Sequence, residues 1–291
     1  MKKNPTISVT IATVNAPYSL FESLKGYFNQ TLKPLEIIVV CSSQRSTKIA
    51  NFLKVNKKVN LVKLIKFDGD KNEARNVGFS KSSGNFVIYS DDDMIPQENL
   101  IEECTKRTKK FDALIIPEHG TATGKYLAKV YSLEKELVNS DPDALTPRLF
   151  KRSLFKNSEM PFDKKFGILD EWGFNLKLKA KKTKIGTINL SSFTVIDEST
   201  LGVRIKKSFK KGLWIRSLIK ENKKEGLRRV NPIKRGIQFY GGKSHYFKKT
   251  PVIFTSLLFI KSLDVFAFLL GLFVSLITKP YAHLDKFKFA K

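Results

Sequence analysis

The first hundred residues alternate apolar, strand-like runs with helix-like segments, and this alternation limits the possible folds more than any other feature. The four apolar runs cover residues 6–14, 35–40, 59–65 and 86–89. Between the first two runs, Leu20, Leu24 and Phe28 recur at the spacing of an amphipathic helix. A strand, a helix and a second strand make the parallel crossover unit. The pattern therefore predicts an α/β fold with a mostly parallel, doubly wound sheet.

The fourth run ends in three consecutive carboxylates, Asp91, Asp92 and Asp93, which we call the carboxylate triplet. Ligands of open α/β sheets collect at the carboxyl ends of the strands, which favours a binding site here. Acidic oxygens suit a hard divalent cation, Mg²⁺ or Mn²⁺, and such a cation typically accompanies a phosphorylated ligand. Aspartate is also common in ordinary turns, so a solvated turn is the alternative.

Further helices and strands are expected between the triplet and residue 200. The apolar spacing favours helices over residues 97–110, 124–139 and 170–181, and strands over 111–117 and 148–154. Residues 185–195 are expected to form a strand pair or an irregular β segment. Asp70 is the expected N-cap of a helix that ends at Lys81. We expect one α/β domain over residues 1–200, a basic linker or helical segment over 201–250, and an apolar, membrane-associated helical segment with a basic tail over 251–291.

The composition changes after residue 200. Residues 204–249 carry 16 Lys or Arg against two Glu, and residues 251–278 are mostly apolar. An uninterrupted membrane span needs about 20 apolar residues, and Lys261 and Asp264 interrupt this stretch, although at i, i+3 they can pair. The stretch could form one tilted span, a re-entrant or interfacial helical hairpin, or a buried core helix.

The net charge of +26 implies an anionic partner, which could be a nucleic acid, a phosphorylated substrate or an acidic membrane surface. A basic block beside an apolar stretch is what an anionic leaflet attracts. The only two cysteines, Cys41 and Cys104, match no metal-binding spacing, so reduced thiols are expected. Residues 1–5 lack the apolar region of a signal peptide. We therefore expect the chain at the cytoplasmic face of the cell membrane.

Five short motifs together resemble glycosyltransferase family 2 in their order and approximate spacing. They cover residues 9–15, 28–31, 35–40, 72–78 and 90–93. The resemblance extends over about residues 6–200 and implies the GT-A fold, with Mg²⁺ or Mn²⁺ at an Asp-x-Asp motif. Combined with the basic and apolar C-terminal part, it implies an inverting enzyme that transfers a hexose from a nucleotide sugar to a lipid-linked or surface-glycan acceptor.

The resemblance also implies roles for individual residues near the strand ends. Asp93 is the expected metal ligand, Asp91 shares the metal or supports the donor, and Asp92 contacts the ribose or caps the turn. Arg75 matches an arginine that faces the base or the diphosphate of the donor. The other residues expected to bind the donor are Thr13, Asn15, Ser42 and Ser43.

A second acidic pair resembles the catalytic acids of the family. Phe162-Asp163 precedes it, and ungapped alignment sets Asp170 on the family's glutamate and Glu171 on its aspartate, so the pair is inverted. By position, Glu171 is the expected general base that deprotonates the acceptor hydroxyl, with Asp170 as the second candidate. Two adjacent carboxylates on a regular helix cannot both face one substrate, so one of them is expected to be structural.

The chain departs from the family after the second strand, where members usually carry an aspartate that recognises the base. Here the sequence is Cys41-Ser42-Ser43-Gln44, whose hydroxyl and amide groups could still hydrogen-bond a base edge, and the donor base stays open. A later basic and aromatic segment lies where members bind the diphosphate or a lipid phosphate, although the same lysine spacing suits a solvated helix face. Its candidate residues are Lys207, Lys210, Lys211 and Trp214.

Two other functions stay open. Lysines alternate with aromatic residues around 239–249, which would suit a nucleic acid. The sequence contains no recognised nucleic-acid motif, and the charge lies beside an apolar stretch, so nucleic acid is the less favoured partner. The missing base-recognition aspartate and the inverted acid pair are compatible with an inactive relative that only binds a nucleotide sugar.

Overall fold

The computed structural model describes residues 4–15, 18–121, 125–139, 145–190, 192–195, 200–231, 241 and 243–278. Two compact units divide the chain. The first contains Met1–Lys164 and Phe174–Asp197, and the second contains Lys165–Gly173 and Glu198–Lys291. The chain therefore passes from the first unit to the second after Lys164 and returns after Gly173. Both crossings lie within residues 1–200, which the sequence predicts to be one domain.

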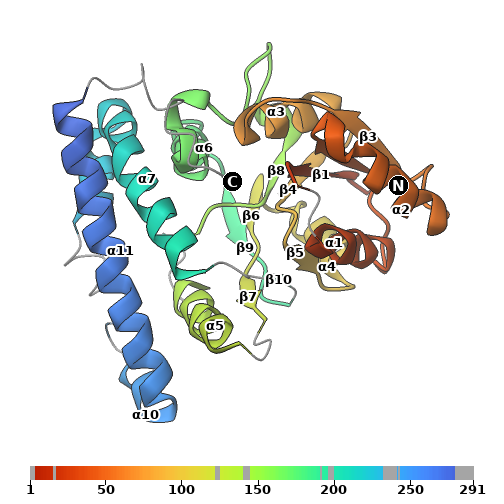
Figure 1. The fold of residues 1–291 in the computed structure, drawn as a ribbon. Coiled ribbons are helices and arrows are strands. Elements are labelled where there is room, and N and C mark those ends of the chain that lie inside the picture. The colour runs from red at the N-terminus through yellow and green to blue at the C-terminus, as the bar shows by residue number, and fades with distance from the viewer. Residues whose placement is uncertain are drawn as a thin grey trace. The chain divides into compact units, whose positions relative to one another are not determined.

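A seven-stranded sheet forms the centre of the first unit, with the strand order β3-β2-β1-β4-β8-β6-β9 (Figure 1). The strands are β1 (Ile7–Thr13), β2 (Glu36–Cys41), β3 (Val62–Lys66), β4 (Phe86–Ser90), β6 (Ala113–Ile115), β8 (Leu149–Lys151) and β9 (Ile185–Thr187). In this sheet β8 pairs antiparallel with β4 and β6, and the other pairs are parallel. The predicted mostly parallel α/β sheet is confirmed.

Helices cover both faces of this sheet because successive side chains of a strand point to opposite sides. Ile7, Val9 and Ile11 of β1 share a core with α1 (Tyr18–Phe28), α2 (Ser46–Val55) and α4 (Leu100–Arg107). On the other face, Ala12 packs with Ala74 of α3 (Lys71–Lys81). Figure 1 shows α3 on one side of the sheet and α1 and α4 on the other. The first unit also contains α5 (Tyr126–Asn139) and most of α6 (Asp170–Ala180).

A second sheet of three short strands follows directly after the carboxylate triplet. Its order is β5-β10-β7, and its strands are β5 (Met94–Pro96), β10 (Phe193–Val195) and β7 (Glu118–Gly120). β5 begins at the residue after Asp93 and pairs antiparallel with β10. The triplet is therefore held between the end of one sheet strand and the start of another, which restricts its backbone more than a free turn would.

Several expected strands are shorter in the structure, and the strand expected over residues 111–117 spans only Ala113–Ile115. The third strand begins only at Val62, because residues 56–61 turn and Lys57 has a positive φ of 52°. The expected strand over residues 148–154 is a strand only to Lys151, and a 3-10 turn covers Arg152–Leu154.

Gln30, in the motif after the first helix, has a structural role. Its side-chain amide donates to the Gln97 carbonyl at 2.7 Å and the Gly26 carbonyl at 3.1 Å, and its carbonyl accepts the Ile101 N–H at 2.9 Å. The residue is buried. Because these bonds tie the end of α1 to the start of α4, this motif stabilises the fold at the edge opposite the carboxylate triplet.

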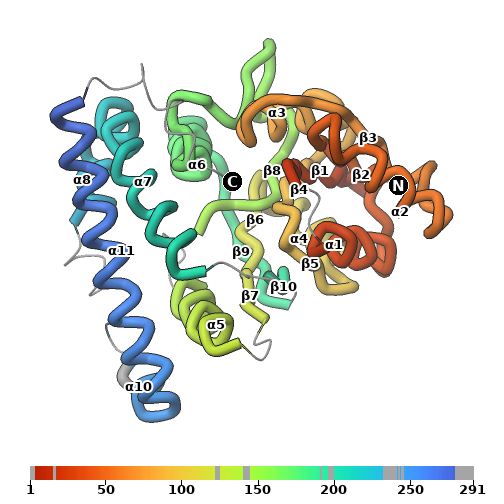
Figure 2. Tube along the Cα trace, in the orientation of Figure 1, coloured from red at the N-terminus to blue at the C-terminus, as the bar shows by residue number. Residues whose placement is uncertain are grey.

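The second unit consists of helices that the sequence places in the basic and apolar segments. They are α7 (Leu201–Glu221), α8 (Lys223–Val230), α10 (Ser244–Lys249) and α11 (Pro251–Ile277). α11 is one continuous helix, so the expectation of a helical hairpin within residues 251–278 is wrong. Lys261 and Asp264 do not break it, because the Asp264 carboxylate accepts hydrogen bonds from Arg204 and Ser208 of α7. α7 and α11 lie side by side (Figure 2).

Candidate active site

Three parallel strands end together at one edge of the large sheet and bring predicted site residues to the same place. In the strand register, Thr13 of β1 pairs with Cys41 of β2, and Ile11 pairs with Ser90 of β4. The Thr13 hydroxyl donates to the Asp92 carboxylate at 2.6 Å. Thr13 and the carboxylate triplet are therefore in direct contact, although 79 residues separate Thr13 from Asp92 in the sequence.

Asp91 is surrounded by three cations. Its Oδ1 lies 2.6 Å from Arg75 Nη2 and 2.8 Å from Lys71 Nζ, and its Oδ2 lies 3.3 Å from Arg148 Nη1. Burial by itself would raise the pKa of this carboxyl, but the charges of Lys71, Arg75 and Arg148 outweigh it and hold the pKa well below its usual range. Asp91 is therefore an anion in the folded protein.

The start of α3 determines where Arg75 lies. Asp70 caps this helix as predicted, since its carboxylate accepts the N–H groups of Asn72 and Glu73 and the Glu73 carboxylate accepts the Asp70 N–H in return. Arg75 follows one turn later. This capping box fixes the first turn, so the guanidinium reaches Asp91 from a rigid helix.

Aromatic rings hold the guanidinium groups beneath the triplet. The Arg75 guanidinium lies 5.1 Å from the centroid of Tyr89 and 5.2 Å from that of Phe162, and the Arg148 guanidinium lies 5.0 Å from the Tyr89 centroid. Arg75 is buried, with a side-chain exposure of 2%. Both cations are therefore held in defined positions, and neither is a solvated surface residue.

A chain of partly buried ion pairs continues from Asp91 to Lys135. Arg148 also contacts Glu118 at 2.8 Å, and Lys135 contacts the other oxygen of Glu118 at 2.5 Å. Burial would raise the pKa of Glu118, but Arg148 and Lys135 lower it to about 2. The signs alternate along the chain, so each buried charge is neutralised by its neighbours. Lys71, Arg148 and Lys135 were not predicted as site residues, because no local sequence pattern relates them to the triplet.

Asp92 and Asp93 differ from Asp91 in their electrostatics. Burial raises the pKa of Asp92 although Thr13 donates to it. Burial, and then repulsion by Asp91 and Asp92, raises the pKa of Asp93 to about 6. Among the described residues, no hydrogen bond or ion pair to the Asp93 carboxylate is present. Crowded acidic oxygens of this kind gain from a divalent cation, which removes the repulsion.

The protein side chains at this edge offer an incomplete set of ligands for a metal. Within the described part of the chain, no group of three or more His, Cys, Asp or Glu side chains could hold a metal ion by itself. Mg²⁺ is commonly bound by one or two carboxylates together with substrate phosphates. Asp93 and its neighbours therefore fit a cation that shares its coordination with a phosphorylated ligand.

The serines after β2 do not present free hydroxyl donors. Ser42 Oγ donates to the Val14 carbonyl at 2.9 Å. Ser43 donates twice to Asp68, from its N–H at 2.9 Å and from its hydroxyl at 2.5 Å. These two bonds lower the pKa of Asp68 and orient its exposed carboxylate at the carboxyl end of β3. Asp68 was not predicted as a site residue, although its position two residues after β3 is a signal that the sequence contains.

The second acidic pair belongs to the second unit and forms the first turn of α6. Asp170 is buried, and Glu171 is half-buried. Glycine is needed at position 167, where φ is +50° and the Trp214 ring packs against the backbone. Lys165 contacts Glu221 at 2.8 Å, and the Arg229 guanidinium lies 4.6 Å from the Trp172 ring. The turn that carries both acids is therefore fixed to α7 and α8.

The remaining predicted residues have varied surroundings. Asn15 is exposed just after β1. On α7, Lys207 and Lys211 are exposed, Lys210 is half-buried, and Trp214 packs on Gly167. Part of the segment 239–249, considered above for a nucleic acid, lies outside the described residues.

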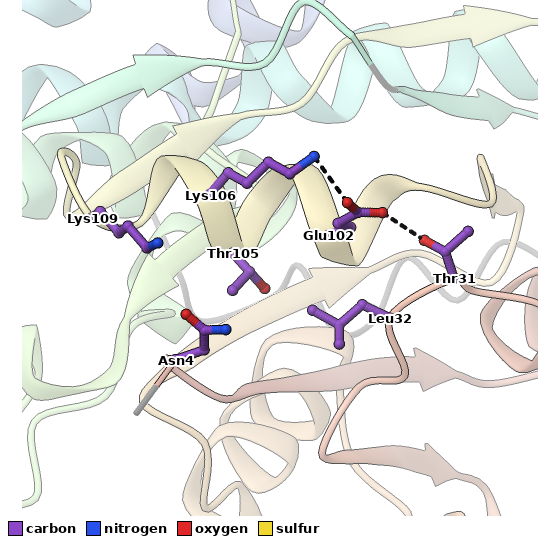
Figure 3. A pocket seen from close by; sticks show the side chains of 7 residues that line it. All are labelled: Asn4, Thr31, Leu32, Glu102, Thr105, Lys106 and Lys109. Carbon is purple, nitrogen blue, oxygen red and sulfur yellow. Dashed lines mark hydrogen bonds and ion pairs between the residues drawn. The ribbon is translucent and has the colours of Figure 1, made fainter. Parts of the chain in front are cut away.

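A separate surface hollow of about 450 Å³ lies away from these groups. It is lined by Asn4, Thr31, Leu32, Glu102, Thr105, Lys106 and Lys109. Figure 3 shows Glu102 between Thr31 and Lys106, with distances of 3.1 Å and 2.9 Å. Asn4 and Leu32 precede β1 and β2, so the hollow is at the amino ends of these strands. Ligands of such sheets bind at the carboxyl ends, so the candidate site is at the carboxylate triplet.

Comparisons of the sequence with known proteins give consistent results. A sequence model of the family described as "Glycosyl transferase family 2" matches residues 8–175, which is more than half of the chain. An "Uncharacterized glycosyltransferase" of Haemophilus influenzae is 28% identical over 142 residues, covering 48% of this chain and 42% of the relative. A "GalNAc(5)-diNAcBac-PP-undecaprenol beta-1,3-glucosyltransferase" of Campylobacter jejuni is 26% identical over 168 residues, covering 53% of this chain and 54% of the relative. The matches thus span about half or less of these relatives.

Comparison of structures supports the same fold. The mannosyltransferase PcManGT from Pyrobaculum calidifontis, solved in complex with GDP-Man and Mn²⁺, superposes with a TM-score of 0.55 at 15% sequence identity. The similarity covers 95% of this chain and 76% of that one. At this identity the comparison shows the fold alone.

Proposed function

The chain belongs to glycosyl transferase family 2, and on this premise we propose that it is a metal-dependent, inverting, membrane-associated transferase that moves a hexose from a nucleotide sugar to an acceptor. The observation that carries the proposal is the bond of 2.6 Å between Arg75 and Asp91, which joins two of the motifs at the carboxyl edge of the sheet. A buried cation and adjacent acidic oxygens are the groups that a metal-bound diphosphate requires.

Asp93 is the proposed principal ligand of Mg²⁺ or Mn²⁺. Asp91, with its three cationic partners, supports the metal and the donor from the side, and Asp92 caps the turn or contacts the ribose. A bound divalent cation would neutralise the charge that develops on the leaving nucleoside diphosphate. The Mn²⁺ in the complex of PcManGT supports this choice of metal. Thr13 holds Asp92 in place through its hydroxyl.

Asp68 is the proposed reader of the donor base, in place of the aspartate missing after β2. An ionised carboxylate only accepts hydrogen bonds, so it selects a base that presents an N–H group. Uracil, thymine and guanine present a ring N–H at their pairing edge, whereas adenine and cytosine present an acceptor nitrogen there. Ser43 orients Asp68, and Ser42, Asn15 and Arg75 complete the proposed donor site.

Glu171 is the proposed general base. It takes the proton of the acceptor hydroxyl while the hydroxyl oxygen forms a bond to the anomeric carbon and the bond from that carbon to the diphosphate breaks, which inverts the configuration. The half-buried position of Glu171 supports this role, and the burial of Asp170 supports a structural one. Both carboxylates lie at a helix start, where the helix dipole stabilises negative charge.

The proposed acceptor is lipid-linked or part of a surface glycan, and the proposed location is the cytoplasmic face of the membrane. The name of the Campylobacter jejuni relative includes an undecaprenol-linked diphosphate. α11 is long and apolar enough to cross a membrane by length and composition, with a mean hydropathy of 2.2. Lys207, Lys210, Lys211 and Trp214 of α7 are the proposed contacts of the diphosphate or the lipid phosphate.

Release of nucleoside diphosphate from a panel of nucleotide sugars tests the proposal, with Mn²⁺, with Mg²⁺ and after chelation. We expect turnover with one donor and a loss of at least tenfold after chelation. Asp93→Ala should abolish metal-dependent donor binding, whereas the control Asp112→Ala, a surface acid 3.7 Å from Lys151, should not. The absence of metal-dependent turnover with every donor would overturn the proposal, and binding without turnover would identify an inactive relative.

A further inference from the structure

α11 has two distinct faces. One face is a stripe of exposed apolar side chains, Val252, Phe259, Phe266, Leu270, Phe273 and Ile277, which recur at helical spacing. Phe259, Phe266 and Phe273 are 62%, 69% and 58% exposed. The opposite face is buried and includes Ala267 and Gly271. A helix of 27 residues is about 40 Å long, so the stripe is long enough to match a bilayer thickness or to lie along its surface.

α7 is locked along the buried face of α11. The Asp264 carboxylate accepts Arg204 Nη2 at 2.6 Å and Ser208 Oγ at 2.8 Å. Further along, a Cβ atom on Gly212 would clash with the Phe268 carbonyl. Arg216 then donates to the Ser275 carbonyl. Residues 204, 212 and 216 of α7 thus contact residues 264, 268 and 275 of α11 in the same order. The two helices are therefore parallel and in close contact.

The side of α7 that faces away from α11 is basic. Arg204, Ser208, Gly212 and Arg216 contact α11 and are spaced by four residues, which puts them on one face of the helix. At this spacing Lys206, Lys207 and Lys210 fall on the opposite side and Lys211 lies at its flank, and we call these four residues the lysine face; Lys206, Lys207 and Lys211 are exposed. The pair of helices therefore has an apolar side on α11 and a cationic side on α7.

This arrangement conflicts with a spanning orientation of α11. Any stretch of about 20 residues within 251–278, the length that a span needs, includes residues 259–270. The part of that stretch from Asp264 onward lies beside residues 204–212 of α7. A spanning α11 would therefore place the lysine face of α7 in the hydrocarbon, where charged side chains are costly. An orientation in the plane of the membrane avoids this cost.

We propose that α11 lies in the plane of an anionic phospholipid surface, with its apolar stripe in the acyl-chain boundary and the lysine face of α7 directed away from the bilayer, which favours the donor diphosphate over a lipid phosphate as the ligand of these lysines. The inference rests on the membrane association proposed above and adds its orientation. α11 is apolar around most of its circumference, and α7 supplies the polar side of the pair. A surface with an apolar and a cationic side binds membranes through buried apolar area and attraction to anionic lipid. Lys248 and Lys249 of α10 are exposed at the start of α11, and the chain carries a net charge of +26, so an anionic surface is complementary.

Accessibility of the two ends of α11 separates the orientations. Lys249→Cys and Thr278→Cys variants of the full chain, which place a thiol just before α11 and at its end but outside the apolar stripe, are bound to sealed vesicles of phosphatidylglycerol and phosphatidylcholine, and labelled with a membrane-impermeant maleimide before and after permeabilisation. Both positions are exposed, whereas the native Cys41 and Cys104 are buried, and the unsubstituted chain measures their background. We expect both ends to label equally before and after permeabilisation. Protection of one end until permeabilisation would overturn the in-plane orientation.

Vesicle flotation tests the stripe itself. The triple variant Phe259→Glu, Phe266→Glu and Phe273→Glu should float at least tenfold less than the unsubstituted chain, because a charged stripe cannot enter the acyl boundary. The control Val55→Glu alters an 82% exposed residue of α2 and should float normally. Unchanged flotation of the triple variant, or self-association without vesicle binding, would overturn the inference. Donor turnover by a chain that fails to float would leave the transferase proposal intact.

Discussion

The Arg75 guanidinium donates to the Asp91 carboxylate at 2.6 Å and links two motifs that lie sixteen residues apart in the sequence. Arg75 comes from the second turn of α3, and Asp91 follows the last residue of β4. The bond fixes the helix to the strand end and keeps a buried carboxylate charged beside Asp92 and Asp93. The geometry of the whole triplet therefore depends on this pair.

Arg75→Ala should lower the free energy of unfolding by about 1–3 kcal/mol, because it removes one of the three cations around Asp91 while Lys71 and Arg148 remain. Asp91→Asn should cost less than Arg75→Ala, since the amide keeps the shape of the side chain. Urea denaturation of both single variants and the double variant measures their coupling. The exposed Arg152→Ala serves as control and should change stability by no more than about 0.5 kcal/mol. Strict additivity of the two single effects would contradict the finding that they interact.

Glu171→Gln should reduce kcat by about 10²–10⁴-fold and leave donor affinity unchanged, since it removes the proposed proton acceptor without altering size. Asp170→Asn should chiefly lower thermal stability, because Asp170 is buried. Steady-state kinetics, calorimetric binding of the donor and thermal unfolding distinguish the two acids. If Asp170→Asn removed turnover at an unchanged melting temperature while Glu171→Gln remained active, the assignment of the base would be reversed.

Asp68→Asn should weaken binding of the preferred nucleoside diphosphate by roughly 1–3 kcal/mol, because it replaces one acceptor oxygen by a donor. Binding of UDP, GDP, CDP and ADP in the presence of Mn²⁺, measured by calorimetry, gives the order of preference. We expect UDP or GDP to bind best to the unsubstituted chain, and the variant to lose that preference. Ser43→Ala should have a smaller effect in the same direction. An unchanged order in Asp68→Asn would show that another group reads the base.

The Glu36 side chain, at the start of β2, is expected to make the stability of the fold depend on pH in the acid range. Burial would raise the pKa of Glu36, but hydrogen bonds from Lys63, Ser83 and Ser8 lower it from 4.5 to about 2. A depressed carboxyl pKa stabilises the fold above pH 4.5 and loses that contribution as the pH falls toward 2.

Glu36→Gln should therefore be less stable than the unsubstituted chain by about 2–3 kcal/mol at pH 7. The difference in unfolding free energy should shrink as the pH falls below 4.5. In that range the Glu36 carboxyl is protonated in the unfolded chain but still ionised in the folded protein, so protonation favours unfolding. Urea titrations between pH 7 and acid conditions measure this change. Glu98→Gln, at an exposed position, provides the control. A difference that stays constant over the whole range would exclude a role for the Glu36 charge.

The large sheet followed from the sequence because each strand and helix is set by local periodicity. The runs at residues 6–14, 35–40 and 86–89 became β1, β2 and β4 with shifts of no more than one residue at their ends. The parallel order of these strands brought Thr13 and the carboxylate triplet to one edge, which the sequence also predicted. Asp70 was identified as a helix cap for the same reason, since a capping box is a local pattern.

Only the tertiary structure decided which charges meet. Arg148 reaches Asp91 from 57 residues away, and Ser43 binds Asp68 across 25 residues, through strand pairing that no local pattern encodes. The same holds for α11. Its sequence predicts an apolar helix but not which face of that helix is exposed. The contact with α7 through Arg204 and Asp264 decides which face stays exposed. Periodicity is a property of neighbouring residues, and the partners of a buried charge are set by the packing of distant elements.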